Sequence, residues 1–238
     1  MVSLLLPIIY TAFISLGLPD SLLGSAWPTM YPELGGPVSC AGILSMIISL
    51  GTILSSLQSD RLTRTLGTGR VTAISVGMTA AALFGFSIST QFWMLCLWAI
   101  PYGLGAGSVD AALNNYVALH YRSRHMSWLH CMWGIGTMVS PMVMGAALTH
   151  GMHWTVGYRA IALFQVLLPV VLVVSLPLWK ERRTESGTEE TAPQALSLRQ
   201  VFALPGAREV MLCFFCYCAL ETTAGLWASS YLTLSRGV

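Results

Sequence analysis

Seven stretches of this sequence are apolar for about 20 residues or more, which is the length a helix needs to cross the hydrocarbon core of a bilayer. Hydrophobic residues make up 55% of the chain and charged residues only 9%, whereas soluble domains usually carry about 25% charged residues. We therefore predict an all-α fold, a polytopic transmembrane helical bundle. The seven predicted helices cover residues 4–30, 38–57, 71–90, 92–119, 126–148, 156–179 and 210–234.

The basic residues lie almost entirely on one side of this predicted bundle. Of the 12 Lys and Arg residues, only Arg159 and Arg236 fall outside the loops that follow the second, fourth and sixth helices. Loops rich in Lys and Arg remain in the cytoplasm. We therefore predict a cytoplasmic N-terminus, and a cytoplasmic position for the polar stretch 180–207, whose Glu, Thr and Ser content is typical of a flexible linker.

Three acidic residues, Asp20, Asp110 and Glu221, fall inside the apolar runs. A charged side chain at the centre of a membrane helix costs roughly 2.5–3.5 kcal/mol on insertion scales, so such residues usually face a cavity or a partner. No Lys or Arg lies at a comparable depth in the sequence. Desolvation then favours the neutral acid, and a group of this kind can carry a proton. The alternative is a neutral acid that serves only helix packing.

Helical spacing places amide and aromatic side chains beside these acids. Residues three or four positions apart share a helix face, so Asn114 neighbours Asp110, and His130 lies on one face with Trp133. Amides and carboxylates bind hydroxyl groups, and aromatic rings stack on the C–H face of a sugar. For Trp27 and Trp133 the alternative is anchoring at the membrane interface. The candidate substrate-binding residues are Asp20, Trp27, Asn114, Asn115, His130, Trp133 and Glu221.

Two phrases of the sequence resemble a known transporter family. Residues 17–28 read Gly-Leu-Pro-Asp-Ser-Leu-Leu-Gly-Ser-Ala-Trp-Pro, and residues 105–115 read Gly-Ala-Gly-Ser-Val-Asp-Ala-Ala-Leu-Asn-Asn. They resemble the first and fourth helices of the major facilitator superfamily, in its fucose-permease-like branch. Asp60 and Arg61 are similar to the cytoplasmic loop signature of that superfamily, in which Ser56 and Thr63 replace two usual glycines.

The resemblance implies twelve helices in two six-helix halves. On that pattern, residues 1–179 form the first bundle, residues 180–207 the linker, and residues 208–238 the first helix of an incomplete second bundle. Glu221 and Gly225 repeat the spacing of Asp20 and Gly24, as two related halves would. The resemblance thus implies a chain that is truncated relative to this architecture.

The function that the resemblance implies is secondary active transport of a small polar solute, a sugar, by proton symport with alternating access. Asp110 and Asp20 would couple the proton, and Asp60 with Arg61 would form a cytoplasmic gate loop. The implied location is the bacterial inner membrane, where the chain would contact lipids, its solute and a proton. The alternative is a non-transporting or degenerate membrane fragment with an interaction or regulatory role.

Other function classes lack their sequence signals. A retinal protein needs a lysine in the seventh helix, and residues 210–234 contain none. Cys213, Cys216 and Cys218 have no fourth ligand of matching type nearby, so we expect no metal site. No catalytic phrase and no phosphate-binding loop occurs, and a net charge of only +2 gives no nucleic-acid footprint. We expect no enzymatic activity, no cofactor and no nucleic-acid partner.

Overall fold

The computed structural model describes residues 4–179 and 198–237, and this part of the chain contains helices and no strand. The long helices are α1 (Leu5–Gly17), α2 (Leu22–Glu33), α3 (Cys40–Leu66), α4 (Thr68–Ile88), α5 (Phe92–His120), α6 (Ser123–Thr149), α7 (Trp154–Val174) and α9 (Ala207–Tyr231). Three short elements complete it: η1 (Leu176–Trp179), α8 (Leu198–Ala203) and η2 (Leu232–Arg236), the last a single π-helical stretch.

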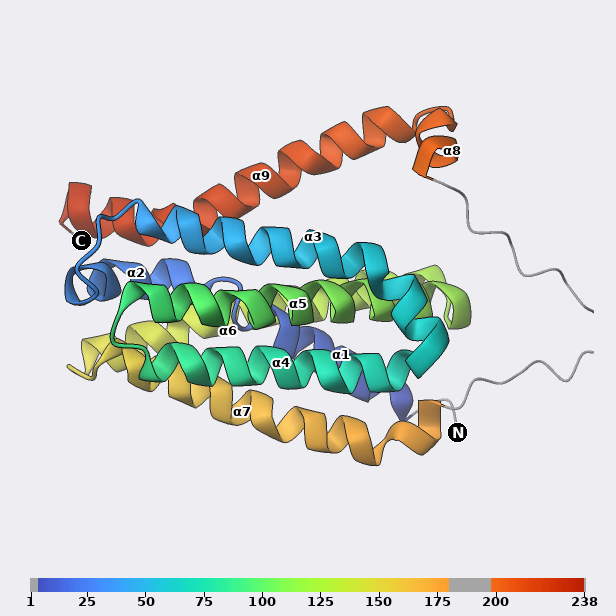
Figure 1. The fold of residues 1–238 in the computed structure, drawn as a ribbon, viewed down its shortest axis with the longest axis horizontal. Coiled ribbons are helices and arrows are strands. Elements are labelled where there is room, and N and C mark those ends of the chain that lie inside the picture. The colour runs from blue at the N-terminus through green and yellow to red at the C-terminus, as the bar shows by residue number, and fades with distance from the viewer. Residues whose placement is uncertain (1–3, 180–197, 238) are drawn as a thin grey trace, which may run out of the picture.

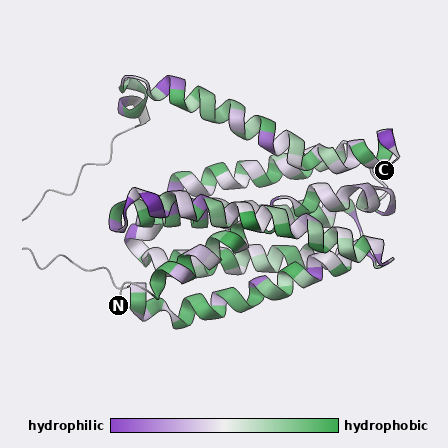
Figure 2. Ribbon diagram, turned by 180° about the vertical axis from the view of Figure 1, so that it is seen from behind, coloured by the Kyte–Doolittle hydropathy of each residue, from purple (hydrophilic) through white to green (hydrophobic). Residues whose placement is uncertain are grey.

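Seven helical segments are long and apolar enough to cross a membrane, which confirms the predicted fold class. The first of them, Leu5–Glu33, consists of α1 and α2. Its helix is broken at residues 18–21, where the sequence Gly17-Leu-Pro19 predicts an interruption. Apolar residues make up most of the long helices (Figure 2), and many of their large apolar side chains are exposed, as contact with lipid requires.

The N-terminus, the α3–α4 turn, the α5–α6 turn and α8 lie at one end of the bundle, and the α2–α3, α4–α5 and α6–α7 connections lie at the other (Figure 1). This alternation places the loops that carry most of the basic residues at the same end. The arrangement agrees with the predicted topology, although which end is cytoplasmic remains a prediction.

Helix α5 is the central element of the bundle, and glycines make its position possible. A Cβ atom on Gly103 would meet the backbone of Ile48 in α3, and one on Gly105 would lie 2.6 Å from the carbonyl oxygen of Ser75 in α4. Helices without side chains at a contact can approach until their backbones touch. Helices α3 and α4 therefore pack closely against two sides of α5, with α7 against α4.

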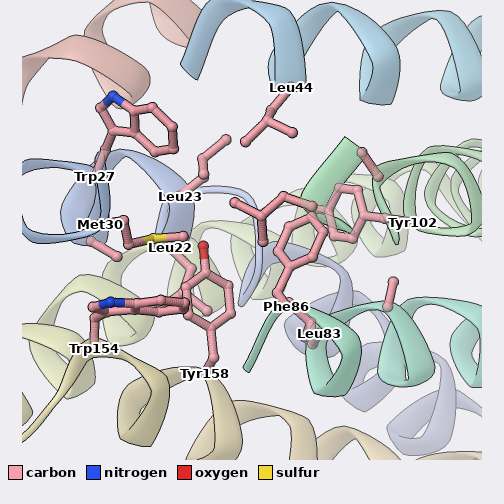
Figure 3. Packing of buried hydrophobic residues seen from close by; sticks show 14 of the residues in the cluster. Leu22, Leu23, Trp27, Met30, Leu44, Leu83, Phe86, Tyr102, Trp154 and Tyr158 are labelled. Atoms are coloured by element: carbon pink, nitrogen blue, oxygen red, sulfur yellow. The ribbon is translucent and has the colours of Figure 1, made fainter. Parts of the chain in front are cut away.

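Two hydrophobic clusters hold the bundle together, one toward each end. The first joins α2 to α4, α5 and α7, and Figure 3 shows Leu22, Met30, Phe86 and Tyr158 within it. The second surrounds α1 and includes Trp179 of η1, which covers the backbone of Gly69 in α4. These clusters fix α1 and α2 separately, one on each side of the break between them.

Helix α9 packs against the other long helices along only part of its length. Its C-terminal half contacts α2, whereas its N-terminal half diverges toward α8 (Figure 1). Apolar side chains such as Phe214, Phe215 and Leu220 are more than 60% exposed on it. Of the predicted linker, residues 180–197 lie outside the described residues, and residues 198–203 form α8 rather than an irregular segment.

Candidate functional site

Two adjoining cavities, of about 660 Å³ and about 540 Å³, lie between α9 and the rest of the bundle. They share the side chains of Asp20, Tyr102, Trp133 and Glu221 as part of their lining. Volumes of this size are in the range of small-molecule sites. The divergence of α9 from α3 leaves this space open between them, so the cavities arise from the arrangement of the helices.

Asp20 lies in the break between α1 and α2 and presents its carboxylate to both cavities. The Tyr102 hydroxyl of α5 donates a hydrogen bond to Oδ1 over 3.0 Å, and the Trp133 indole Nε1 of α6 donates to Oδ2 over 2.8 Å. Both carboxylate oxygens thus have a neutral donor. Three elements that are far apart in sequence converge on this one side chain.

Glycines at the α1–α6 contact bring Trp133 within reach of Asp20. A Cβ atom on Gly17 would collide with the Trp133 carbonyl oxygen, and one on Gly136 would lie 2.9 Å from the backbone nitrogen of Leu18. Each glycine faces the backbone of the opposite helix, so any larger residue at either position would separate the two helices. The short Trp133–Asp20 hydrogen bond depends on this approach.

Asp110 lies deeper along α5 and lines the smaller cavity. Asn114 Nδ2 donates to Asp110 Oδ1 over 2.9 Å and to the Asp110 backbone carbonyl over 3.0 Å, as their four-residue spacing predicts. Tyr102 and Ala106 precede Asp110 at the same spacing and line the same cavity. One face of α5 therefore joins the surroundings of Asp20 to those of Asp110.

Helix α9 supplies the opposite wall. Glu221, Cys218 and Phe214 line both cavities, at spacings of three and four residues that place them on one helix face. Below them, Gly24 of α2 meets the backbone of Gly225, and a Cβ atom on Gly24 would lie 3.0 Å from the Gly225 carbonyl carbon. The two glycines whose spacing to an acid is shared by the two helices thus lie in direct contact, while the relation of the helices as repeats stays a prediction.

The cavity walls combine carboxylates with hydroxyl groups and aromatic rings. Three acids line them, and no Lys or Arg does so within the described parts of the chain. His130, also on the wall of the smaller cavity, adds an imidazole to this lining. Ser45, Ser49, Thr52 and Thr137 add hydroxyl groups. Such a site can exchange a proton and bind either a hydroxylated or a positively charged ligand.

Three of the predicted binding residues, Trp27, Asn114 and Asn115, line neither cavity. Asn114 instead donates a hydrogen bond to Asp110. Trp27 is 1% exposed within the first hydrophobic cluster, and its Nε1 donates to the Val38 carbonyl oxygen over 2.7 Å. Trp27 therefore points away from Asp20, which precedes the first residue of α2 and does not follow that helix's periodicity. Asn115 is exposed and projects about 100° away from Asn114 around α5.

The residues of the proposed gate loop are distant from the cavities. Asp60 and Arg61 lie near the end of α3, and the Asp60 carboxylate accepts a hydrogen bond from Arg64 Nε over 3.1 Å. Both partners of this ion pair are largely exposed, and exposed pairs one helical turn apart add little stability. A role for Asp60 and Arg61 in gating remains a prediction.

Tyr102 and Tyr158 are cavity residues that the sequence interpretation missed. Tyr102 could have been identified, because it lies two helical turns before Asp110 on the same face. Tyr158 is 1% exposed and its hydroxyl has no hydrogen-bond partner in the structure. Figure 3 shows this hydroxyl directed toward Leu22 in the interior. An aromatic residue in an apolar helix gives no sequence signal of that kind.

Comparison with known proteins identifies related transporters. The family model described as Major Facilitator Superfamily matches residues 9–238. An uncharacterized transporter of Sinorhizobium fredii is 26% identical over 135 residues, which cover 54% of this chain and 34% of that protein. The quinolone resistance protein NorA of Staphylococcus aureus is 24% identical over 229 residues, which cover 93% of this chain and 56% of NorA. The chain thus spans about half the length, or less, of these curated relatives.

Proposed function

This chain belongs to the Major Facilitator Superfamily, and from that premise we propose that it acts in proton-coupled secondary transport of a small polar solute, as the part of the transporter that carries the coupling acids. The transporter spans the bacterial inner membrane with the N-terminus in the cytoplasm. Its cavity opens alternately to the two sides of the membrane as the N-terminal bundle and α9 move relative to each other.

The observation that carries this proposal is the pair of hydrogen bonds to Asp20. A carboxylate in a membrane cavity needs compensation for lost water, and here the compensation comes from the neutral donors of Tyr102 and Trp133. Asp20 remains a hydrogen-bond acceptor that can orient a solute. Asp110 has a single side-chain donor, Asn114, and is the proposed protonation site.

A sugar is the solute class that we propose first. The Trp133 ring offers a surface on which the C–H face of a sugar can stack, and Ser45, Ser49 and Thr52 offer hydroxyl groups on the α3 side of the cavity. The fucose-permease-like phrases of the sequence favour the same class. Uptake by symport then follows if the solute and the proton bind the same open state.

A second candidate is the export of an aromatic compound that carries a positive charge. The observation in its favour is the combination of three acids with aromatic side chains, among them Phe86 and Phe214, on a wall with no Lys or Arg in the described residues. Aromatic faces and carboxylates both attract organic cations. NorA, a relative of the chain, is named for quinolone resistance.

The test is transport by the chain in proteoliposomes with an imposed pH gradient, with labelled monosaccharides and a fluorescent aromatic cation as separate probes. Asp110→Asn mimics the protonated acid, so it should abolish gradient-driven accumulation and leave counterflow largely intact, because counterflow moves no net proton. The matched control is Glu209→Gln in the exposed first turn of α9, which should change neither. Accumulation by the Asp110→Asn variant would refute the assignment. Absence of transport of every probe would favour the non-transporting alternative.

A further inference from the structure

The break between α1 and α2 leaves a backbone carbonyl without its usual partner. In a continuous helix the carbonyl of Ser15 would accept a hydrogen bond from the backbone nitrogen of residue 19. Residue 19 is proline, which has no N–H to donate. Around the break, the Leu18 N–H donates to the Ile14 carbonyl over 3.0 Å and the Asp20 N–H donates to the Gly17 carbonyl over 3.3 Å. Neither of these backbone bonds uses the Ser15 carbonyl.

A side chain from another helix fills this vacancy. Gln165 of α7 is fully buried, and its Nε2 donates a hydrogen bond to the Ser15 carbonyl oxygen. An amide is expensive to bury in an apolar helix unless it is bonded. The N–H group of this α7 amide therefore takes the place of the backbone N–H that Pro19 lacks in the first span.

The other end of the Gln165 amide argues against a role in packing alone. Its Oε1 is buried and has no hydrogen-bond partner in the structure. An apolar side chain of similar size would fill the space without leaving a polar atom unpaired. The amide is useful at this place because of its N–H group, and the one acceptor that this group contacts is the Ser15 carbonyl.

We propose that Gln165 is a positioning residue of the transport site: its amide replaces the backbone donor missing at Pro19 and holds the break in the shape that presents Asp20 to Tyr102 and Trp133. The break is the covalent connection between α1, which packs mainly on α6, and α2, which packs mainly on α9. Its shape thus determines where the Asp20 carboxylate lies. The consequence for transport rests on the proposed function, whereas the hydrogen bond at the break does not.

The test is a double-mutant cycle between positions 165 and 19 in the purified full chain. Gln165→Leu leaves the Ser15 carbonyl unpaired and should loosen the break. Pro19→Ala supplies the missing N–H, so the effect of Gln165→Leu should fall to less than half in that background. The control is Leu172→Ala, a buried change in the same helix that contacts α1 through the second hydrophobic cluster. The effect of Leu172→Ala should be the same whether residue 19 is proline or alanine.

Two measurements read the cycle. One is the thermal unfolding midpoint, and the other is the rate at which Ser21→Cys, on the wall of the larger cavity, reacts with a soluble maleimide in a background without native thiols. Gln165→Leu should raise the labelling rate about fivefold, the factor that one buried hydrogen bond represents. Gln165→His keeps an N–H donor and should retain the original rate, which provides an answer even if Pro19→Ala does not fold.

The outcomes separate the inference from the proposed function. The inference would be overturned if Gln165→Leu had the same effect with proline and with alanine at position 19. Equal labelling rates of the Gln165→Leu and Gln165→His variants would overturn it as well. If Pro19→Ala suppresses the effect of Gln165→Leu but the chain transports no probe, the role of Gln165 at the break would be supported. The transport proposal would then be refuted. Normal transport by Gln165→Leu together with an unchanged labelling rate would show that Asp20 needs no such support.

Discussion

Replacement of Gly136 by alanine tests the contact that brings α6 to the break in the first span. The added Cβ atom would lie 2.9 Å from the Leu18 nitrogen and 3.0 Å from the Gly17 Cα atom, and it would also collide with the Ile14 carbonyl oxygen. All three neighbours are backbone atoms, so no side-chain rotation can relieve the contact. Helix α6 must move away from α1.

The size of the effect follows from these distances. Ordinary contacts of a Cβ atom are 3.4 Å or longer, so relief of the collision with the Ile14 carbonyl requires the helices to separate by about 1 Å, and overpacking of this kind typically costs about 1–3 kcal/mol. In a chain of this length that corresponds to a fall of about 2–12 °C in the unfolding midpoint. The Trp133–Asp20 hydrogen bond, now 2.8 Å, would stretch toward the limit of about 3.5 Å.

Gly145→Ala is the matched control, because it lies on the same helix and a Cβ atom there would meet nothing within 4 Å. It should be neutral or slightly stabilising, since alanine favours a helix over glycine by up to about 1 kcal/mol. The assay is the fraction of detergent-solubilised protein that stays monodisperse on size-exclusion chromatography after heating. If the two variants unfold at the same temperature, the close α1–α6 approach does not support Asp20 as argued.

Two further predictions concern topology and the buried hydroxyl groups. With the N-terminus in the cytoplasm, Ser39→Cys but not Thr65→Cys should react with an impermeant thiol reagent on intact cells, in a background without native thiols; the reverse pattern would invert the orientation. Tyr158→Phe removes a hydroxyl with no partner and should leave the unfolding midpoint unchanged or higher, whereas Tyr102→Phe removes a donor to Asp20 and should lower it; equal losses in thermal scans would contradict this distinction.

The predictable part of this molecule is the part governed by the membrane. Apolar length alone located the seven spans, and the cost of placing a carboxylate against lipid located Asp20, Asp110 and Glu221 on cavity walls. Local periodicity also placed Asn114 on the same helix face as Asp110, where the structure shows a hydrogen bond between them. These features depend on spacing within one helix or on the solvent around it, and both can be read from the chain.

The unpredictable part depends on contacts between helices. The position of Trp27 could not be inferred from Asp20, because the break at residues 18–21 resets the direction of side chains. The role of Gln165 required knowledge that α7 passes the carbonyl that Pro19 leaves free. Its presence as an amide among apolar residues was a usable signal, but the partner could come only from the tertiary structure.

The backbone contact between Gly24 and Gly225 has a mechanical consequence. It joins the backbones of α2 and α9 near one end of the bundle, where Leu226 and Trp227 of α9 also pack against the first hydrophobic cluster. A tilt of α9 about this anchored end would therefore move mainly the far end of the helix. From Gly225 to Ala207 the arm is about 27 Å long. A tilt of about 10° at the glycines would therefore move the far end of α9 by about 5 Å. This is enough to widen or narrow the mouth of the cavity, while the end at the Gly24–Gly225 contact moves little.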